Sequence, residues 1–136
     1  MQDVRGIMST QIVAIGAGDL LLTAHDIMRL GDVRHMPVVR SGKLVGVVSE
    51  RDLLRALPSH LGDAEVEGDR RFLNSVPVSR VMSSPAIVID AKASVREAAR
   101  VMAEKKIGCL PVMDDMGRLL GIVTETDILH VVAEGH

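Results

Sequence analysis

Two short polar clusters, one in each half of the sequence, contain the residue types of a nucleotide site. The first is Ser49-Glu50-Arg51-Asp52 and the second is Thr124-Glu125-Thr126-Asp127. If a helix begins at each hydroxyl residue, its free N–H groups and its dipole favour an anion such as phosphate. The aspartate one turn later can accept hydrogen bonds from both hydroxyl groups of a ribose, each worth about 1.5–3 kcal/mol because the acceptor is charged. Phosphate at the helix end and ribose on the aspartate together describe a nucleotide site.

The same spacing is also typical of a simple helix cap. A Ser or Thr followed three residues later by an acid, ahead of Leu53-Leu54 or Ile128-Leu129, is the pattern of a capping box. For either copy alone, capping is the better interpretation. Gly46 and Gly121 precede the clusters and would let a backbone or a ligand approach closely, although a strand glycine can equally mark a β-bulge.

The two clusters belong to a longer internal duplication. His35-Met36-Pro37-Val38-Val39 reappears as Cys109-Leu110-Pro111-Val112-Met113, and Met8-Ser9-Thr10 reappears as Met82-Ser83-Ser84. A duplication of this length indicates two copies of one folding unit. We therefore expect three parts, which are a first repeat over residues 1–57, a connector over 58–77 and a second repeat over 78–136.

Both repeats contain the same order of predicted elements. β-Branched runs on either side of a glycine-containing turn indicate hairpins, Ser94 with Glu97 forms another capping box, and Gly31 is expected to end the first helix. In the first repeat we expect an extended piece at 12–15, a helix at 20–30, a hairpin around 40–43 and a helix from 49. In the second repeat we expect an extended piece at 87–89, a helix from 94, a hairpin around 114–118 and a helix from 124. The order is β-α-β-β-α, twice.

This order predicts an α/β (α+β) fold made of a pseudo-two-fold pair of repeats. One β-α-β-β-α unit is small for independent stability, so we expect the two units to stack sheet against sheet and share a core. In the connector we expect one helical stretch around Asp69 to Ser75, with Phe72 and Leu73 packed against that core.

The composition limits the classes of protein that the chain can be. Of 136 residues, 47% are hydrophobic, but there is no Trp or Tyr and only one Phe, so aliphatic side chains must line any pocket for a flat ring. The net charge is −2 and the charges are mixed along the chain, which argues against nucleic-acid binding. No run approaches the roughly 18 apolar residues of a membrane span. With one cysteine and no signal pattern at the N-terminus, we expect a cytoplasmic protein.

Neither a metal site nor a catalytic site is expected. The five histidines lack the spacing of metal ligands, and a zinc site needs about four converging ligands. Cys109 is interpreted as a small buried hydrophobe, with a redox role as the alternative. No nucleophile, base and orienting group fall into a catalytic motif, so we do not expect an enzyme.

Both halves resemble the cystathionine β-synthase (CBS) domain, and the pair resembles a Bateman module. The resemblance rests on Gly-hydrophobic-x-Ser/Thr-x-x-Asp, complete in both repeats, and on the upstream Pro37-Val38 and Pro111-Val112. It implies that Asp52 and Asp127 bind ribose, with the hydroxyl residues near ribose or phosphate. It also implies that adenine lies between the segment before each proline and the first short strand.

The resemblance implies two sets of site residues. The first set is Asp52, Ser49, Arg51, Arg34, His35, Met36, Pro37, Thr10 and Val13. The second set is Asp127, Thr124, Thr126, Gly108, Cys109, Leu110, Pro111, Ser84 and Ile87. Because Arg34, His35 and Arg51 have the uncharged counterparts Gly108, Cys109 and Thr126, we expect the first site to hold a more highly phosphorylated nucleotide or to bind more tightly. The alternative is that both arginines are solvated surface charges.

The leading functional hypothesis is a stand-alone regulatory protein that binds an adenosine nucleotide in the cleft between the repeats. AMP, ADP or ATP is expected, with S-adenosylmethionine and NADH as further candidates. The resemblance also implies a homodimer formed through helices, and a chain of this size would signal to a protein effector in trans. The alternatives are a dimeric interaction module with unused nucleotide sites and an enzyme with cryptic hydrolase activity.

Overall fold

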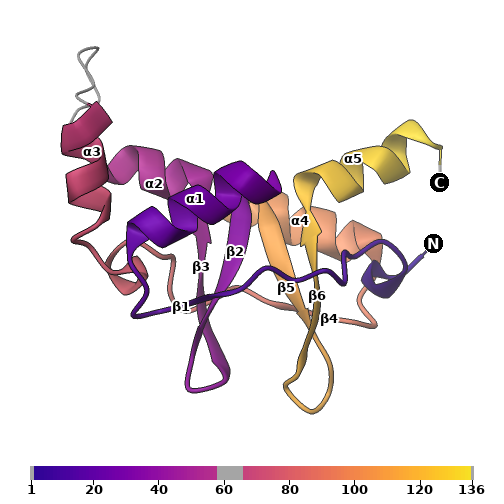
Figure 1. Ribbon diagram of the computed structural model, residues 1–136. Coiled ribbons are helices and arrows are strands. Elements are labelled where there is room, and N and C mark those ends of the chain that lie inside the picture. The colour runs from indigo at the N-terminus through magenta and orange to yellow at the C-terminus, as the bar shows by residue number, and fades with distance from the viewer. Residues whose placement is uncertain (1, 58–65, 136) are drawn as a thin grey trace. The chain divides into compact units, whose positions relative to one another are not determined.

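The structure is a computed structural model that describes residues 2–57 and 66–135, with the side chains of 66–68 excluded (Figure 1). The chain divides into two compact units. The central unit runs from Val13 to Ala86. The terminal unit joins the N-terminal segment up to Ile12 to the segment from Ile87 onward. Residues 58–65 of the predicted connector, His60 among them, lie outside the described residues.

Each unit contains a three-stranded sheet, in the order β1-β2-β3 or β4-β5-β6. The first strand of each sheet runs parallel to the second, and the other two form an antiparallel hairpin. The central unit contains β1 (Ile15–Gly16), α1 (Leu21–Gly31), β2 (His35–Arg40), β3 (Lys43–Ser49), α2 (Glu50–Ala56), α3 (Val66–Leu73) and the 3-10 turn η2 (Val78–Arg80). The terminal unit contains the 3-10 turn η1 (Val4–Gly6), β4 (Ile89–Asp90), α4 (Val95–Lys105), β5 (Cys109–Met113), β6 (Leu119–Thr124) and α5 (Glu125–Ala133).

The predicted order β-α-β-β-α is therefore confirmed in both repeats. The first strands are shorter than expected and begin later, at Ile15 and Ile89. The first hairpin turns at Ser41 and Gly42, whose φ values of 52° and 77° are typical of the type I′ turn that joins twisted strands. α1 does end at Gly31, but the left-handed residue that stops it is Asp32, with φ 52°.

The start of α4 shows half of the predicted capping box. Ser94 Oγ accepts a hydrogen bond from Glu97 N at 3.0 Å. This bond satisfies one of the free N–H groups of the first helical turn.

The opening segment of each sequence repeat packs in the unit that holds the other repeat's hairpin. Val4, near the N-terminus, is fully buried in the terminal unit, and Val78, at the start of the second repeat, is fully buried in the central unit. Ser9 exchanges two main-chain hydrogen bonds with Ile122, at 2.9 and 3.0 Å, and Ser83 does so with Val47, at 2.8 and 3.1 Å. We call these two pairs the Ser9–Ile122 bridge and the Ser83–Val47 bridge.

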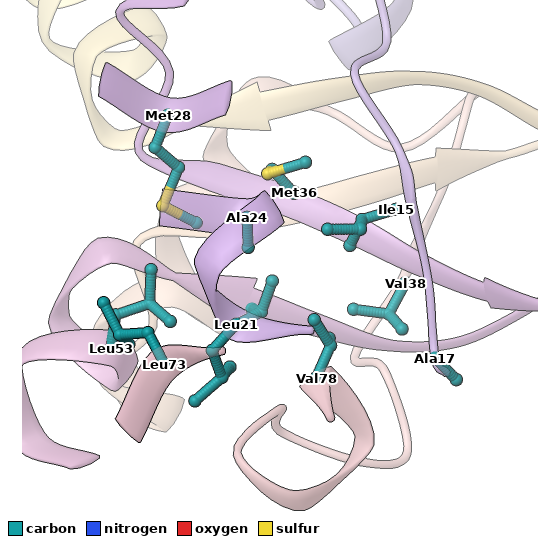
Figure 2. Packing of buried hydrophobic residues seen from close by; sticks show 11 residues of the cluster. Ile15, Ala17, Leu21, Ala24, Met28, Met36, Val38, Leu53, Leu73 and Val78 are labelled. Carbon is teal, nitrogen blue, oxygen red and sulfur yellow. The ribbon is translucent and has the colours of Figure 1, made fainter. Parts of the chain in front are cut away.

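The buried hydrophobic residues form one cluster in each unit, where one shared core was expected. In the central unit, the cluster includes side chains from α1, β2, α2, α3 and η2, among them Leu21 and Val38 (Figure 2). Leu73 is buried there and Phe72 packs against the cluster, as expected of both, although α3 begins before the predicted Asp69. Because the opening segments are exchanged, each sheet buries apolar side chains from both sequence repeats. Each unit therefore has a cluster of its own.

Candidate functional site

Ser49 and Asp52 form a reciprocal cap at the junction of β3 and α2. Ser49 N donates to Asp52 Oδ2 at 2.8 Å, and Asp52 N donates to Ser49 Oγ at 3.1 Å. The helix forms here because the serine hydroxyl and the aspartate carboxylate satisfy N–H groups that have no partner within the helix. The capping prediction is therefore confirmed, and it places the aspartate at the start of the helix.

Thr124 and Asp127 form the same cap at the junction of β6 and α5. Thr124 N donates to Asp127 Oδ2 at 2.8 Å, and Asp127 N donates to Thr124 Oγ1 at 3.4 Å. The threonine hydroxyl also donates to Asp127 Oδ2 at 3.1 Å. The second cap therefore has one more recorded hydrogen bond than the first, the bond from the Thr124 hydroxyl to Asp127 Oδ2.

The caps fix the orientation of each carboxylate while leaving one oxygen unused. The recorded bonds to Asp52 and Asp127 all go to Oδ2, and within the described chain no bond to Oδ1 of either residue is recorded. Both aspartates are half-buried. An ionised carboxylate offers about four acceptor positions on two oxygens. Each aspartate can therefore cap its helix and still accept hydrogen bonds from a ligand hydroxyl.

The segment before each proline is held against the start of the second helix. Glu50 N donates to the Arg34 carbonyl at 2.9 Å, and Glu125 N donates to the Gly108 carbonyl at 3.0 Å. His35 pairs with Ser49 in the hairpin, and Cys109 pairs with Thr124. In each unit the structure thus brings the residues before the proline and the cap residues together. Met36, Pro37, Leu110 and Pro111 are fully buried, so they support the strands from within.

The four residues expected near the first short strands are divided between the units. Thr10 lies in the terminal unit and Val13 in the central unit; Ser84 lies in the central unit and Ile87 in the terminal unit. Ser84 Oγ donates to the Val45 carbonyl at 3.1 Å, which holds its segment against β3. The chain thus changes units between Ile12 and Val13 and between Ala86 and Ile87.

The two helix starts differ in charge, as the sequence indicates. Arg34 and Arg51 are exposed, and within residues 2–57 and 66–135 neither takes part in a recorded ion pair. Their counterparts Gly108 and Thr126 carry no charge. Two guanidinium groups can bind phosphate oxygens in bidentate fashion, and only the central unit provides them at these positions.

One feature at the second hairpin was not anticipated from the sequence. An open hollow of about 230 Å³ is lined by Arg5, Asp114, Asp115, Met116, Arg118 and Leu120. Asp114 accepts from Arg118 N at 2.8 Å and from Arg118 Nε at 2.7 Å, and chiefly the backbone bond lowers the pKa of its carboxyl. In the sequence, the only sign of this hollow is the pair Asp114-Asp115 in the predicted turn. Among the described residues, no group of three or more His, Cys, Asp or Glu side chains could hold a metal ion.

The fold and the two caps define a class, a tandem pair of β-α-β-β-α repeats with equivalent candidate sites at two strand-to-helix junctions. The profile of the CBS domain matches the chain twice, over residues 4–59 and 78–134. The chain belongs to the CBS domain family. The resemblance that the sequence indicated is thereby confirmed. Within the part of the chain that is described, no helix is long and apolar enough to cross a membrane.

Individual relatives agree with this assignment. A CBS domain-containing protein of Dictyostelium discoideum is 32% identical over 130 residues, which cover 95% of this chain and 90% of the relative. The crystal structure of CBSX2, a CBS-pair protein from Arabidopsis thaliana, in complex with AMP is similar with a TM-score of 0.82, at 26% identity over 98% of each chain. The CBS domain pair of protein MJ0100, in complex with 5′-methylthioadenosine and S-adenosyl-L-methionine, has a TM-score of 0.82 at 24% identity over 100% of this chain and 99% of its own.

Proposed function

We propose that the chain is a non-catalytic regulatory module that binds adenosine nucleotides at its two strand-to-helix junctions. The observation that carries the proposal is the paired cap, in which Asp52 and Asp127 are each held through Oδ2 alone. Such an aspartate is oriented before a ligand arrives, so little entropy is lost when it accepts ribose hydroxyls. The CBS family assignment and the AMP in the CBSX2 structure support an adenosine ligand.

In this proposal the remaining site residues have distinct roles. Ser49 and Thr124 lie near ribose or phosphate, and the backbone of the segments before the prolines reads the adenine edge. Thr10, Val13, Ser84 and Ile87 supply the other wall. An aliphatic lining of both sites suits a chain with no Trp or Tyr.

Ligand binding can be tested directly with the purified chain. With no Trp or Tyr, the protein absorbs weakly at 260–280 nm, so a copurified nucleotide dominates the spectrum. Titration with AMP, ADP, ATP, S-adenosylmethionine and NADH should raise the melting temperature by mass action for any ligand that binds the native state. If none of the five raises it, the proposal is wrong, and the alternative of an interaction module with unused sites is favoured.

The two sites are proposed to be unequal. Arg34 and Arg51 flank the first cap, so this site takes the more highly phosphorylated nucleotide or binds it more tightly. The affinities for AMP and ATP are measured on Asp52→Ala and Asp127→Ala chains. The proposed order of the two sites is wrong if Asp52→Ala leaves the affinity unchanged while Asp127→Ala abolishes binding.

We also propose that the chain forms a homodimer through its helices and regulates a protein effector in trans in the cytoplasm. α5 has no buried residue, and its Leu129 and Val132 are 65% and 69% exposed; Leu54 on α2 is 58% exposed. Apolar faces of this kind are typical of protein interfaces. In this proposal the interface is formed by α2 and α5. Sedimentation should then show a dimer for the wild type and for the control Leu30→Lys, since Leu30 lies on α1, and a monomer for Leu129→Lys.

A further inference from the structure

Two methionines, Met8 and Met82, occupy equivalent positions, one in each unit. Met8 follows η1 and donates its N–H to the Val4 carbonyl at 2.9 Å, and Met82 follows η2 and donates to the Val78 carbonyl at 3.0 Å. Both side chains are half-buried and pack against the hydrophobic cluster of their own unit. Each unit thus holds one methionine in the same local setting.

The sulfur of each methionine lies against a glycine of the strand that leads to the cap. A Cβ on Gly121 of β6 would stand 2.7 Å from Met8 Sδ, and a Cβ on Gly46 of β3 would stand 2.8 Å from Met82 Sδ. The sulfur therefore fills the space that a side chain at the glycine would take. Because protein interiors are closely packed, there is no room for a further atom on the glycine side of the sulfur.

The residue after each methionine is hydrogen-bonded to the same strand. Ser9 forms the Ser9–Ile122 bridge in the terminal unit, and Ser83 forms the Ser83–Val47 bridge in the central unit, each through two main-chain bonds. In both strands the bridge residue lies two positions before the residue that caps the following helix. A displacement of the methionine therefore affects the hydrogen bonds that hold the segment on the strand.

The other described methionines differ in exposure or in position. Met28, Met36 and Met102 are at most 6% exposed, which shields them from a dissolved oxidant. Met116 is 78% exposed in the turn of the second hairpin, and Met113 at the end of β5 is half-buried. Neither of these two lies in a bridging segment. Only Met8 and Met82 combine partial exposure with a contact at a bridge.

We propose that Met8 and Met82 are oxidation sites at which a peroxide loosens the strand that leads to the cap of the same unit. A sulfur lone pair attacks one oxygen of hydrogen peroxide, the O–O bond breaks and an S–O bond forms. The transferred oxygen gives its proton to the departing one, which leaves as water, so that the sulfur is oxidised and the peroxide reduced. The product is methionine sulfoxide, a polar side chain. Its oxygen has no room at the glycine and no donor in an apolar cluster, so the oxidised side chain must leave the strand.

The first test treats the full-length chain with hydrogen peroxide and locates the sulfoxides by mass spectrometry. Amide hydrogen exchange is then compared between molecules with and without sulfoxide at each position. Sulfoxide at Met8 should raise the exchange rates of the Ser9 and Ile122 amides about tenfold, the factor expected from the cost of a buried acceptor without a partner. Sulfoxide at Met82 should have the same effect on the two amides of the other bridge.

Leucine variants assign each effect to one sulfur. Leucine is similar in size to methionine and has no sulfur, and volume-conserving exchanges of this kind are tolerated best. After peroxide treatment, Met8→Leu should lose the effect in the terminal unit alone, and Met82→Leu should lose it in the central unit alone. Met113→Leu is the matched control, because Met113 is also half-buried but lies outside both bridging segments. It should keep both effects.

The outcomes are separate from those of the proposed function, because the test uses no nucleotide. The proposal is overturned if Met116 becomes fully oxidised while Met8 and Met82 stay unmodified, or if molecules that carry either sulfoxide exchange at unchanged rates. Persistence of the terminal-unit effect in Met8→Leu contradicts it as well. If a leucine variant does not fold, the comparison within the treated wild type decides, since it needs no substitution.

Discussion

The carbonyl oxygen of Ser9 lies so close to Gly121 that a Cβ on the glycine would stand 2.6 Å from it. Ser83 and Gly46 are related in the same way, at 2.7 Å. The sequence left two explanations for these glycines, close approach and a β-bulge, and both hold. A backbone segment approaches each glycine, and the register of each hairpin shifts beside it, between Val38 and Val39 or between Val112 and Met113.

Gly121→Ala should destabilise the protein by about 1–3 kcal/mol, the usual cost of overpacking. The nearest atom to the added methyl group is a backbone oxygen, which cannot rotate away as a flexible side chain would. The free energy of unfolding is measured in urea. Gly18→Ala, where the added Cβ has open space, should change it by no more than about 0.5 kcal/mol. Equal effects of the two substitutions would show that Ser9 does not pack on the strand.

Val4→Ala and Val78→Ala should each weaken the unit that holds the other repeat's hairpin. Both valines are fully buried, and removing two methyl groups costs at least about 1.5 kcal/mol. Hydrogen exchange on the full chain should show faster opening of β5–β6 in Val4→Ala and of β2–β3 in Val78→Ala. The opposite pattern, with each effect in its own sequence repeat, would contradict the exchanged arrangement.

Thr124→Val and Asp127→Asn test the second cap and the aspartate of the proposed site. Thr124→Val removes the hydroxyl that accepts from Asp127 N, so unfolding free energy should fall by about 1 kcal/mol. Asp127→Asn retains an acceptor for Thr124 N but loses the charge. Its AMP affinity at this site should fall at least about tenfold, since bonds to a charged acceptor are worth about 1.5–3 kcal/mol. Calorimetric titration of both variants checks this, and unchanged AMP binding in Asp127→Asn would remove the aspartate from the site.

Arg118→Gln should raise the pKa of Asp114 part of the way to its ordinary value of 3.8. The bond from Arg118 N, the main cause of the lowered pKa, remains, while the bond from Nε is lost. Carbon-13 titration of the carboxyl group measures the change. Because the folded pKa is depressed, the stabilisation by ionised Asp114 is fully present above pH 3.8 and is lost as the pH falls through the folded pKa. No change in the titration of Arg118→Gln would mean that the side-chain bond does not affect the carboxyl.

Residue types and their spacing were enough to predict the local structure and the candidate chemistry. Reciprocal capping at Ser49 and Thr124 depends on atoms three residues apart, and the hairpin at Ser41-Gly42 depends on which residues accept positive φ. Such short-range preferences can be deduced from residue types alone. The duplication and the motif around each aspartate also sufficed to assign the CBS family, which the profile match confirms.

Which segment covers which sheet could not be predicted from residue types, because it depends on the three-dimensional path of the chain. The duplication makes Met8-Ser9 and Met82-Ser83 equivalent. Either segment could therefore pack beside Gly46 or beside Gly121, and the local sequence does not distinguish these two arrangements. The choice follows from the path of the whole chain, which gives each unit its own buried cluster with chain from both repeats. Burial of Val4 or Val78 is favourable in any apolar site. The path of the folded chain decides which of the two clusters each valine enters.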